Sequence, residues 1–239
     1  MRSLNRIFLF VWWVTVLSGT VLRFFSPLAG ATEATAWSTD RGDAQRSGRS
    51  TTLLGPGSPY IEFSAGFQKN LSNSPIIAFV PDPQPGDLDH KKEVVVVSGE
   101  DHLAILDPNV GEFSWISAIG NSFFSTPAMD EDGNIYLGSH FGKYDATPGG
   151  VHAFNSAGEP IGFFNPDPSA DPSVCFDVSP ALGSNGLLYT GDNRWDSKLY
   201  ALSTPDLSPV WSYPLEIAGE ERYLYVGPVL SPDEAHVLL

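Results

Sequence analysis

Residues 125–139 read STPAMDEDGNIYLGS, and residues 151–155 read VHAFN after a glycine-rich insertion. This pattern is typical of consecutive antiparallel strands, because apolar, β-branched and aromatic residues flank an Asp-Gly turn. The same pattern returns as VSPALGSNGLLYTG at residues 178–191 and LYAL at residues 199–202. The chain is therefore predicted to be a repeat protein, and its architecture follows from the size of the repeat.

Three markers recur along the chain with a period of about 50 residues. They are a proline in the first strand, an alanine in the third and an aromatic residue in the fourth: Pro75, Pro127, Pro180 and Pro228; Ala104, Ala153 and Ala201; Trp115, Phe164 and Trp211. A repeat of this length with four short strands matches one blade of a β-propeller. We predict an all-β propeller with repeats at residues 74–124, 125–177, 178–225 and 226–239, which is about three and a third four-stranded blades.

The predicted number of blades is smaller than a closed ring requires, since a propeller ring has roughly four to eight blades. Three and a third blades would leave open sheet edges, which promote aggregation. We therefore expect the 239 residues to be the N-terminal part of a longer chain. The alternative is that several copies of the chain close the ring together.

The composition excludes several classes of protein. The 28 acidic and 13 basic residues give a net charge of −15, and no basic patch is visible, so nucleic-acid binding is not expected. An acidic surface could instead attract cations or basic partners. The single cysteine, Cys175, excludes an intrachain disulfide and a zinc site with two cysteines. It lies in an apolar run and is predicted to be a buried, unreactive residue.

The N-terminus has the features of a secretory signal peptide at residues 1–31. Arg2 and Arg6 precede an apolar run at residues 7–22, and Ala29-Gly30-Ala31 is a small-residue cleavage site. We expect a signal helix and export to the periplasm or the extracellular space, with an uncleaved membrane anchor as the alternative. Residues 32–73 are predicted to form an N-terminal arm and a linker.

The repeat at Ser179–Tyr213 resembles the quinoprotein-type propeller repeat, which is named for pyrroloquinoline quinone (PQQ) dehydrogenases. This resemblance implies a propeller fold and covers residues 37–239. It is unspecific for function, because the repeat also occurs in cofactor-free propellers such as the propeller subunit of the outer-membrane β-barrel assembly machinery. The adjacent cysteines of the quinoprotein alcohol dehydrogenases are absent, since Cys175 lies between Val174 and Phe176. No position matches their catalytic Asp or their calcium-binding Glu and Asn.

One acidic turn invites comparison with a calcium loop. Asp130, Asp132 and Asn134 alternate as oxygen ligands would, with Gly133 between the last two. A calcium loop also needs an acidic residue at its twelfth position, and Phe141 stands there. The turn is therefore interpreted as a hairpin, and no metal is predicted.

Recognition is expected at the insertions between the second and third strands of repeats two and three. Loops at equivalent repeat positions emerge on the same face of a propeller. The candidate residues combine aromatic and charged side chains suited to binding: His140, Phe141, Lys143, Tyr144, Arg194 and Trp195.

Two functions remain open from the sequence. The first is an exported binding or scaffold module without catalysis or a cofactor, which holds a protein or a small ligand on one face of the propeller. The second is the N-terminal part of a PQQ-dependent dehydrogenase for alcohols or sugars, with PQQ and calcium as cofactors. No catalytic residue is predicted for either.

Overall fold

The computed structural model describes four strands near the N-terminus and most of the chain beyond residue 72. The described residues are 10–11, 15–16, 19–26, 60–67, 73–86, 90–99, 101–118, 125–140, 148–167, 174–194, 196–215, 224 and 226–239. All described regular structure beyond the turns is β, which agrees with the predicted all-β class.

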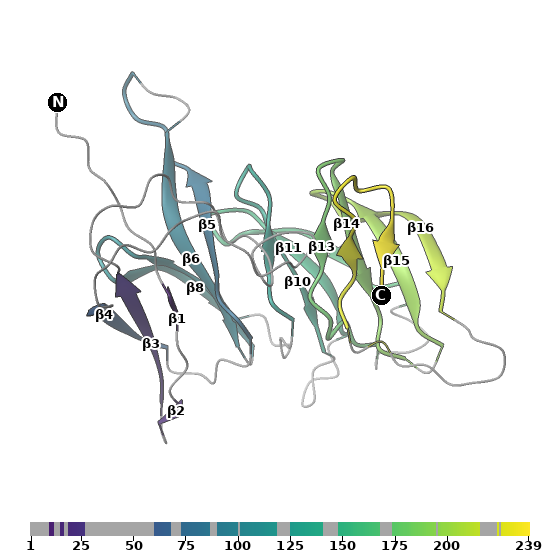
Figure 1. Ribbon diagram of the computed structural model, residues 1–239, viewed down its shortest axis with the longest axis horizontal. Helices are drawn as coiled ribbons and strands as arrows, with labels where there is room; N and C mark the ends of the chain where they lie inside the picture. Colours follow the sequence, from purple (N-terminus) through teal and green to yellow (C-terminus); the bar gives the residue numbers. More distant parts are fainter. Residues whose placement is uncertain are drawn as a thin grey trace.

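Three four-stranded antiparallel sheets and a two-stranded sheet follow one another along the chain (Figure 1). We call them blades one to four. Blade one is β5 (Ile76–Pro81), β6 (Lys91–Gly99), β7 (His102–Asp107) and β8 (Glu112–Ala118). Blade two is β9 (Ala128–Met129), β10 (Ile135–Ser139), β11 (Gly150–Phe154) and β12 (Pro160–Phe164). Blade three is β13 (Ala181–Leu182), β14 (Leu187–Gly191), β15 (Lys198–Ser203) and β16 (Ser208–Pro214), and blade four is β17 (Val229–Leu230) and β18 (Val237–Leu238).

The strands within each blade are neighbours in sequence order, as in an up-and-down meander. This arrangement confirms the predicted four-stranded blades, of which about three and a third are present. Within the described part of the chain, the sheets do not close into a ring.

The core lies between consecutive blades, which explains why the middle strands are apolar on both faces. Adjacent residues of a strand point to opposite faces. On β10, Ile135 and Leu137 pack with residues of blade one, while Tyr136 between them packs with residues of blade three. A third cluster, which includes Tyr189 and Leu230, joins blade three to blade four. Blades two and three thus each bury one face against the preceding blade and the other against the following one.

The recurring Tyr-x-Gly sequence at the end of the second strand has a steric cause. A Cβ on Gly138 would lie 2.0 Å from the carbonyl oxygen of Phe176, in the segment that leads to blade three. A Cβ on Gly191 would lie 2.1 Å from Cδ2 of Leu224, in the segment that leads to blade four. Glycine at this position lets the incoming segment approach the strand.

The strand register corrects two of the sequence markers. Ala153 pairs with Tyr136 and Ala201 with Tyr189, but the residue of β7 at the matching position next to the bulge is Ile105, not Ala104. In the fourth strand the equivalent residues are Trp115, Gly162 and Trp211, since these pair with Ile105, Ala153 and Ala201. Phe164 lies two residues further on. Spacing in sequence missed these offsets because the connections differ in length.

The N-terminal strands form a separate antiparallel sheet. Strand β3 (Gly19–Ser26) pairs with β1 (Phe10–Val11), β2 (Thr15–Val16) and β4 (Tyr60–Phe67). Strands β1 to β3 therefore stand in the segment for which a signal helix is expected. This run is rich in β-branched and aromatic residues, which suit a strand as well as an apolar helix. The other residues of the segment lie outside the described ones, so the signal peptide stays a prediction.

Among the described residues, no helix has the length and apolar character needed to cross a membrane.

Candidate functional site

The two ends of the blades differ in what they carry. We call the end where β10 leads to β11 and β14 leads to β15 the loop end; there Ser139 pairs with Gly150 and Gly191 with Leu199. The opposite end, which we call the turn end, carries the tight turns at residues 130–134 and 155–159. The insertions that the sequence marks as recognition loops belong to the loop end.

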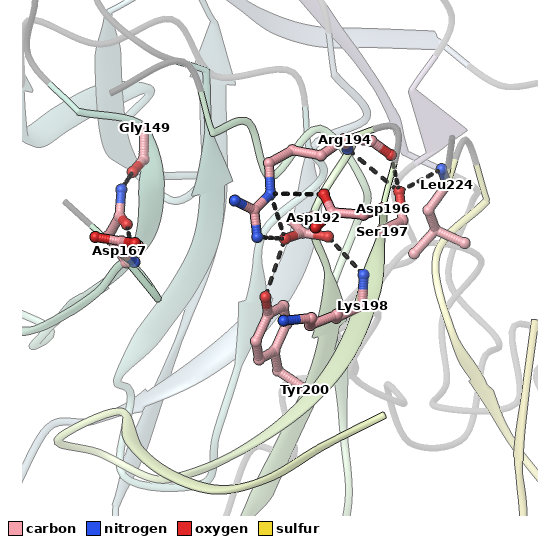
Figure 2. Close-up of polar contacts among 10 residues, drawn as sticks. Gly149, Asp167, Asp192, Arg194, Asp196, Ser197, Lys198, Tyr200 and Leu224 are labelled. Atoms are coloured by element: carbon pink, nitrogen blue, oxygen red, sulfur yellow. Dashed lines mark hydrogen bonds and ion pairs between the residues drawn. The ribbon is translucent and has the colours of Figure 1, made fainter. Parts of the chain in front are cut away.

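Asp192 organises the loop end of blade three (Figure 2). Its side chain is fully buried. One carboxylate oxygen accepts hydrogen bonds from Arg194 Nε at 2.9 Å and from the Tyr200 hydroxyl at 2.9 Å. The other accepts from the backbone N–H of Lys198 at 2.7 Å. We call Asp192, Arg194, Ser197 and Tyr200 the Asp192 network.

The charges in this network compensate each other. Arg194 Nη2 lies 2.8 Å from Asp192, and the arginine side chain is only 16% exposed. Burial opposes the charge of Arg194, but the attraction of the Asp192 carboxylate outweighs it, so the pKa of the guanidinium is raised. Burial and then the same carboxylate raise the pKa of Tyr200. The guanidinium thus lies directly against a buried carboxylate, and hydrogen bonds hold both groups in place.

Ser197 connects this network to the segment that leads to blade four. Its hydroxyl accepts hydrogen bonds from the backbone N–H of Arg194 at 3.2 Å and of Leu224 at 3.3 Å, and donates to the Arg194 carbonyl. Its backbone carbonyl accepts from Leu215 N–H at 2.9 Å. Ser197 is therefore hydrogen-bonded both to the residue that follows β16 and to the segment before blade four.

Blade two has its own contacts at the same end, drawn beside the Asp192 network in Figure 2. The side-chain amide of Asn165 donates to the carbonyl of Gly149 at 2.7 Å, and its oxygen accepts from the backbone N–H of Asp167 at 2.8 Å. These bonds attach the chain after β12 to the end of the insertion that precedes β11.

A serine and a histidine also meet in blade two. Ser139 Oγ lies 2.9 Å from Nε2 of His152, and it also contacts the backbone N–H and C=O of Gly150, each at 3.2 Å. Ser139 is completely buried, so a substrate cannot reach its hydroxyl. Burial lowers the pKa of His152 to about 4. The pair joins β10 to β11, and we assign it a structural role.

The strongest cluster of metal-binding groups is His140, Cys175 and Asp177, whose ligand atoms lie within 4.8 Å of one another. Cys175 is buried, as the sequence predicts. Sequence reasoning singled out His140 alone. Cys175 and Asp177 are 35 and 37 residues further along the chain, and no sequence spacing indicates that they meet His140.

The other predicted site residues separate into two groups. The turn end carries Asp130, Asp132 and Asn134. There the Asp130 carboxylate accepts hydrogen bonds from the backbone N–H groups of Asp132 and Asn134, from the side-chain amide of Asn134 and from the Tyr136 hydroxyl. Its oxygens thus organise the turn. His140 and Arg194 lie at the loop end. Phe141, Lys143, Tyr144 and Trp195 fall outside the described residues.

Sequence reasoning missed Asp192, although it is the centre of the network around Arg194. Asp192 directly follows the Tyr-x-Gly sequence of repeat three. Its burial could not be inferred, because an aspartate after a strand is usually an exposed turn residue.

Comparison with solved structures gives the fold. The structure of BamB from Moraxella catarrhalis aligns with 93% of this chain and 56% of its own, at a TM-score of 0.51 and 14% identity. This chain has a β-propeller fold. Similarity at this level of identity establishes the architecture alone.

Two further solved structures align less closely. A quinohemoprotein alcohol dehydrogenase from Pseudomonas putida HK5 aligns at a TM-score of 0.42 and 17% identity, over 50% of this chain and 25% of that one. A protein of unknown function from Bacteroides caccae aligns at 0.44 and 11%, over 91% and 64%. The chain thus spans less than two thirds of the length of each of these three structures. No family model and no curated protein matches the sequence.

Proposed function

We propose that this propeller is an exported binding module without catalysis of its own, which holds a protein partner at its loop end. The Asp192 network carries the proposal. A buried carboxylate, a compensated arginine and a serine that bonds two backbone segments fix the described residues after β14. A loop fixed before binding loses little conformational entropy when a partner docks, which favours affinity.

The charge of the chain suggests the chemistry of the partner. The net charge of −15 favours a partner with a basic surface. At the loop end Asp192 is neutralised by Arg194, whereas the side chain of Asp196 is 40% exposed and lies 3.8 Å from Arg194. Asp196, which lies beside the Asp192 network, is therefore better placed than Asp192 to meet a cationic side chain.

Export rests on the N-terminal sequence. Arg2, Arg6, the apolar run and the small residues at 29–31 form the pattern that secretion systems recognise. Cleavage after this segment would release the module into the periplasm or the extracellular space, and retention of the segment would tether it to the membrane.

Site-specific photocrosslinking tests the location of the binding surface. A photoreactive residue replaces Asp196 at the loop end in one variant, and Asp132, which is exposed at the turn end, in the control. Both are expressed in the native host with the complete chain. We expect a partner to crosslink from position 196 and not from position 132. The identified partner is then purified, and Asp196→Lys should weaken its binding by about tenfold, while Asp132→Lys should leave it unchanged.

Two outcomes would overturn the proposal. Equal crosslinking from both positions would remove the loop end as the binding surface. Dye-linked oxidation of an alcohol or a sugar by the purified protein, after addition of PQQ and calcium, would show that the module is catalytic and belongs with the dehydrogenases.

A further inference from the structure

Three groups that can bind a transition-metal ion meet between blade two and blade three. An imidazole nitrogen of His140, the thiol sulfur of Cys175 and a carboxylate oxygen of Asp177 all lie within 4.8 Å of one another. His140 directly follows β10, and the other two belong to the segment that leads to β13. The cluster therefore joins two parts of the chain that are distant in sequence.

Backbone hydrogen bonds fix the segment that carries Cys175 and Asp177. The N–H of Phe176 donates to the carbonyl of Ser139 at 3.1 Å, and Asn193 N–H donates to the carbonyl of Cys175 at 2.7 Å. The Phe176 side chain enters the core between blades two and three, while its two neighbours lie beside His140. This alternation is the one expected of an extended segment. Backbone bonds to β10 and to the residue after Asp192 thus position Cys175 and Asp177.

The polar atoms of the site are incompletely satisfied by the protein. Oδ2 of Asp177 accepts a hydrogen bond from the side-chain amide of Asn193 at 3.3 Å. Oδ1 of Asp177 and Oδ1 of Asn193 are buried, and neither has a hydrogen-bond partner among the described residues. A buried acceptor without a partner is costly to the folded state. A cation bound by the carboxylate would remove that cost for Asp177.

We propose that His140, Cys175 and Asp177 bind a zinc ion. Zinc accepts nitrogen, sulfur and oxygen ligands together, whereas calcium and magnesium require oxygen ligands alone. In a tetrahedral zinc site, ligand atoms lie roughly 3.4–3.6 Å apart, given bond lengths of about 2.0–2.3 Å. The ligand atoms lie within 4.8 Å of one another, so binding would draw them together by up to about 1.4 Å, and a water molecule would complete the four ligands.

Asn193 has a supporting role in this site. Its amide holds one oxygen of Asp177, which orients the other oxygen for the metal, as outer-shell partners commonly do for ligating carboxylates. Its backbone also holds Cys175. The bound ion would link the end of β10 to the segment that enters blade three, and would stabilise the contact between these blades.

Metal titration of the purified full-length chain tests the proposal. After treatment with a chelator, zinc is added in competition with a chromophoric chelator, and cobalt(II) is added in a parallel sample. We expect one equivalent of zinc to bind and to raise the thermal unfolding midpoint, since the metal binds the folded state. Cobalt(II) should give a thiolate charge-transfer band in the near-ultraviolet and tetrahedral d–d bands.

Single substitutions identify the ligands. Cys175→Ser, His140→Gln and Asp177→Asn should each weaken zinc binding at least tenfold, and Cys175→Ser should abolish the thiolate band. His236→Gln and Asp132→Asn, both at exposed positions of the turn end, should bind zinc like the unaltered chain.

Three results would overturn the proposal: no zinc uptake by the unaltered chain, a cobalt spectrum without a thiolate band, or unchanged uptake in the Cys175 and His140 variants. The cobalt spectrum of the unaltered chain decides the matter if a variant fails to fold. None of these results bears on the photocrosslinking experiment, so this site and the proposed binding surface are tested separately.

Discussion

The indole N–H of Trp115 in β8 donates a hydrogen bond to the carbonyl of Ser156, 2.9 Å away in the turn between β11 and β12. The bond crosses from blade one to blade two. Gly158 in the same turn faces the indole, and its backbone has a φ of +82°. In blade two the position of Trp115 is occupied by Gly162, which lies against the backbone of Pro205 and Asp206 in the turn of blade three. The outer strand of one blade thus rests on a turn of the next.

This contact predicts that Gly158→Ala is strongly destabilising. The added Cβ would lie 2.7 Å from Cδ2 of Trp115, and alanine would also adopt a left-handed backbone. Gly186→Ala is the matched control, because Gly186 has a φ of +75° and its nearest atom would lie 3.8 Å away. We expect the backbone strain to lower the free energy of unfolding by roughly 1–2 kcal/mol in both variants. The contact with Trp115 should lower it by roughly 1–3 kcal/mol more in Gly158→Ala. Urea unfolding measures both, and equal losses would show that the indole moves aside without cost.

The repeat period predicted the blades because every blade repeats the same local chemistry: a turn, a Tyr-x-Gly strand end and an apolar third strand. It misplaced Phe164 by two residues because the connections differ in length, and it misplaced Ala104 by one residue because strand register depends on which face of the strand meets the neighbouring blade. A shift of one residue changes that face, and sequence spacing does not reveal it. Ile105 and Gly162 occupy the matching positions.

The second prediction concerns the two strand-end glycines. Gly138→Ala should destabilise the protein more than Gly191→Ala. The new Cβ would meet the backbone carbonyl of Phe176 in the first case and the end of the flexible Leu224 side chain in the second. The Leu224 side chain can change rotamer and move this carbon away, whereas the carbonyl of Phe176 is fixed in the backbone of the segment that enters blade three. We expect a loss at or above about 3 kcal/mol for Gly138→Ala, and about 1–2 kcal/mol for Gly191→Ala, in urea unfolding. The reverse order would contradict this account.

The candidate site was predictable only where it coincides with a repeat insertion. The sequence indicated His140 and Arg194 because insertions at equivalent positions emerge together. Their partners, Cys175, Asp177 and Asp192, were not predictable. Each lies near a strand end or in a connecting segment, and only the packing of one blade on another brings it to the site.

The third prediction is a loss of stability in acid that depends on His152. Burial lowers the pKa of its folded-state imidazole from 6.5 to about 4. Between these values the unfolded chain binds a proton that the folded chain does not, so the free energy of unfolding falls as the pH falls. From pH 7.5 to pH 5 the contribution amounts to about 2 kcal/mol.

His152→Gln measures this contribution, since glutamine does not titrate and can still bond Ser139. The unaltered chain should lose about 2 kcal/mol more than this variant between the two pH values in urea unfolding. His90→Gln is the control at an exposed position, and it should follow the unaltered chain. If His152→Gln and the unaltered chain show the same pH dependence, the imidazole is not the group that titrates.

The fourth prediction separates the buried charge of the Asp192 network from the exposed one. Asp192→Asn keeps the shape but removes the charge opposite Arg194, which is itself largely buried, so we expect a loss of roughly 3 kcal/mol. Asp196→Asn is the matched control at a side chain that is 40% exposed and 3.8 Å from Arg194; it should cost roughly 0–1 kcal/mol. Urea unfolding of both variants at pH 7 measures these two losses in the free energy of unfolding.

A double-mutant cycle with Arg194→Gln identifies the contact responsible. If the loss in Asp192→Asn arises from the uncompensated guanidinium, adding Arg194→Gln should recover part of it, with a coupling energy of roughly 1–3 kcal/mol. A coupling near zero would assign the loss to the bonds that Asp192 makes with Lys198 N–H and the Tyr200 hydroxyl. The ion pair between Asp192 and Arg194 would then contribute little to the stability of the protein.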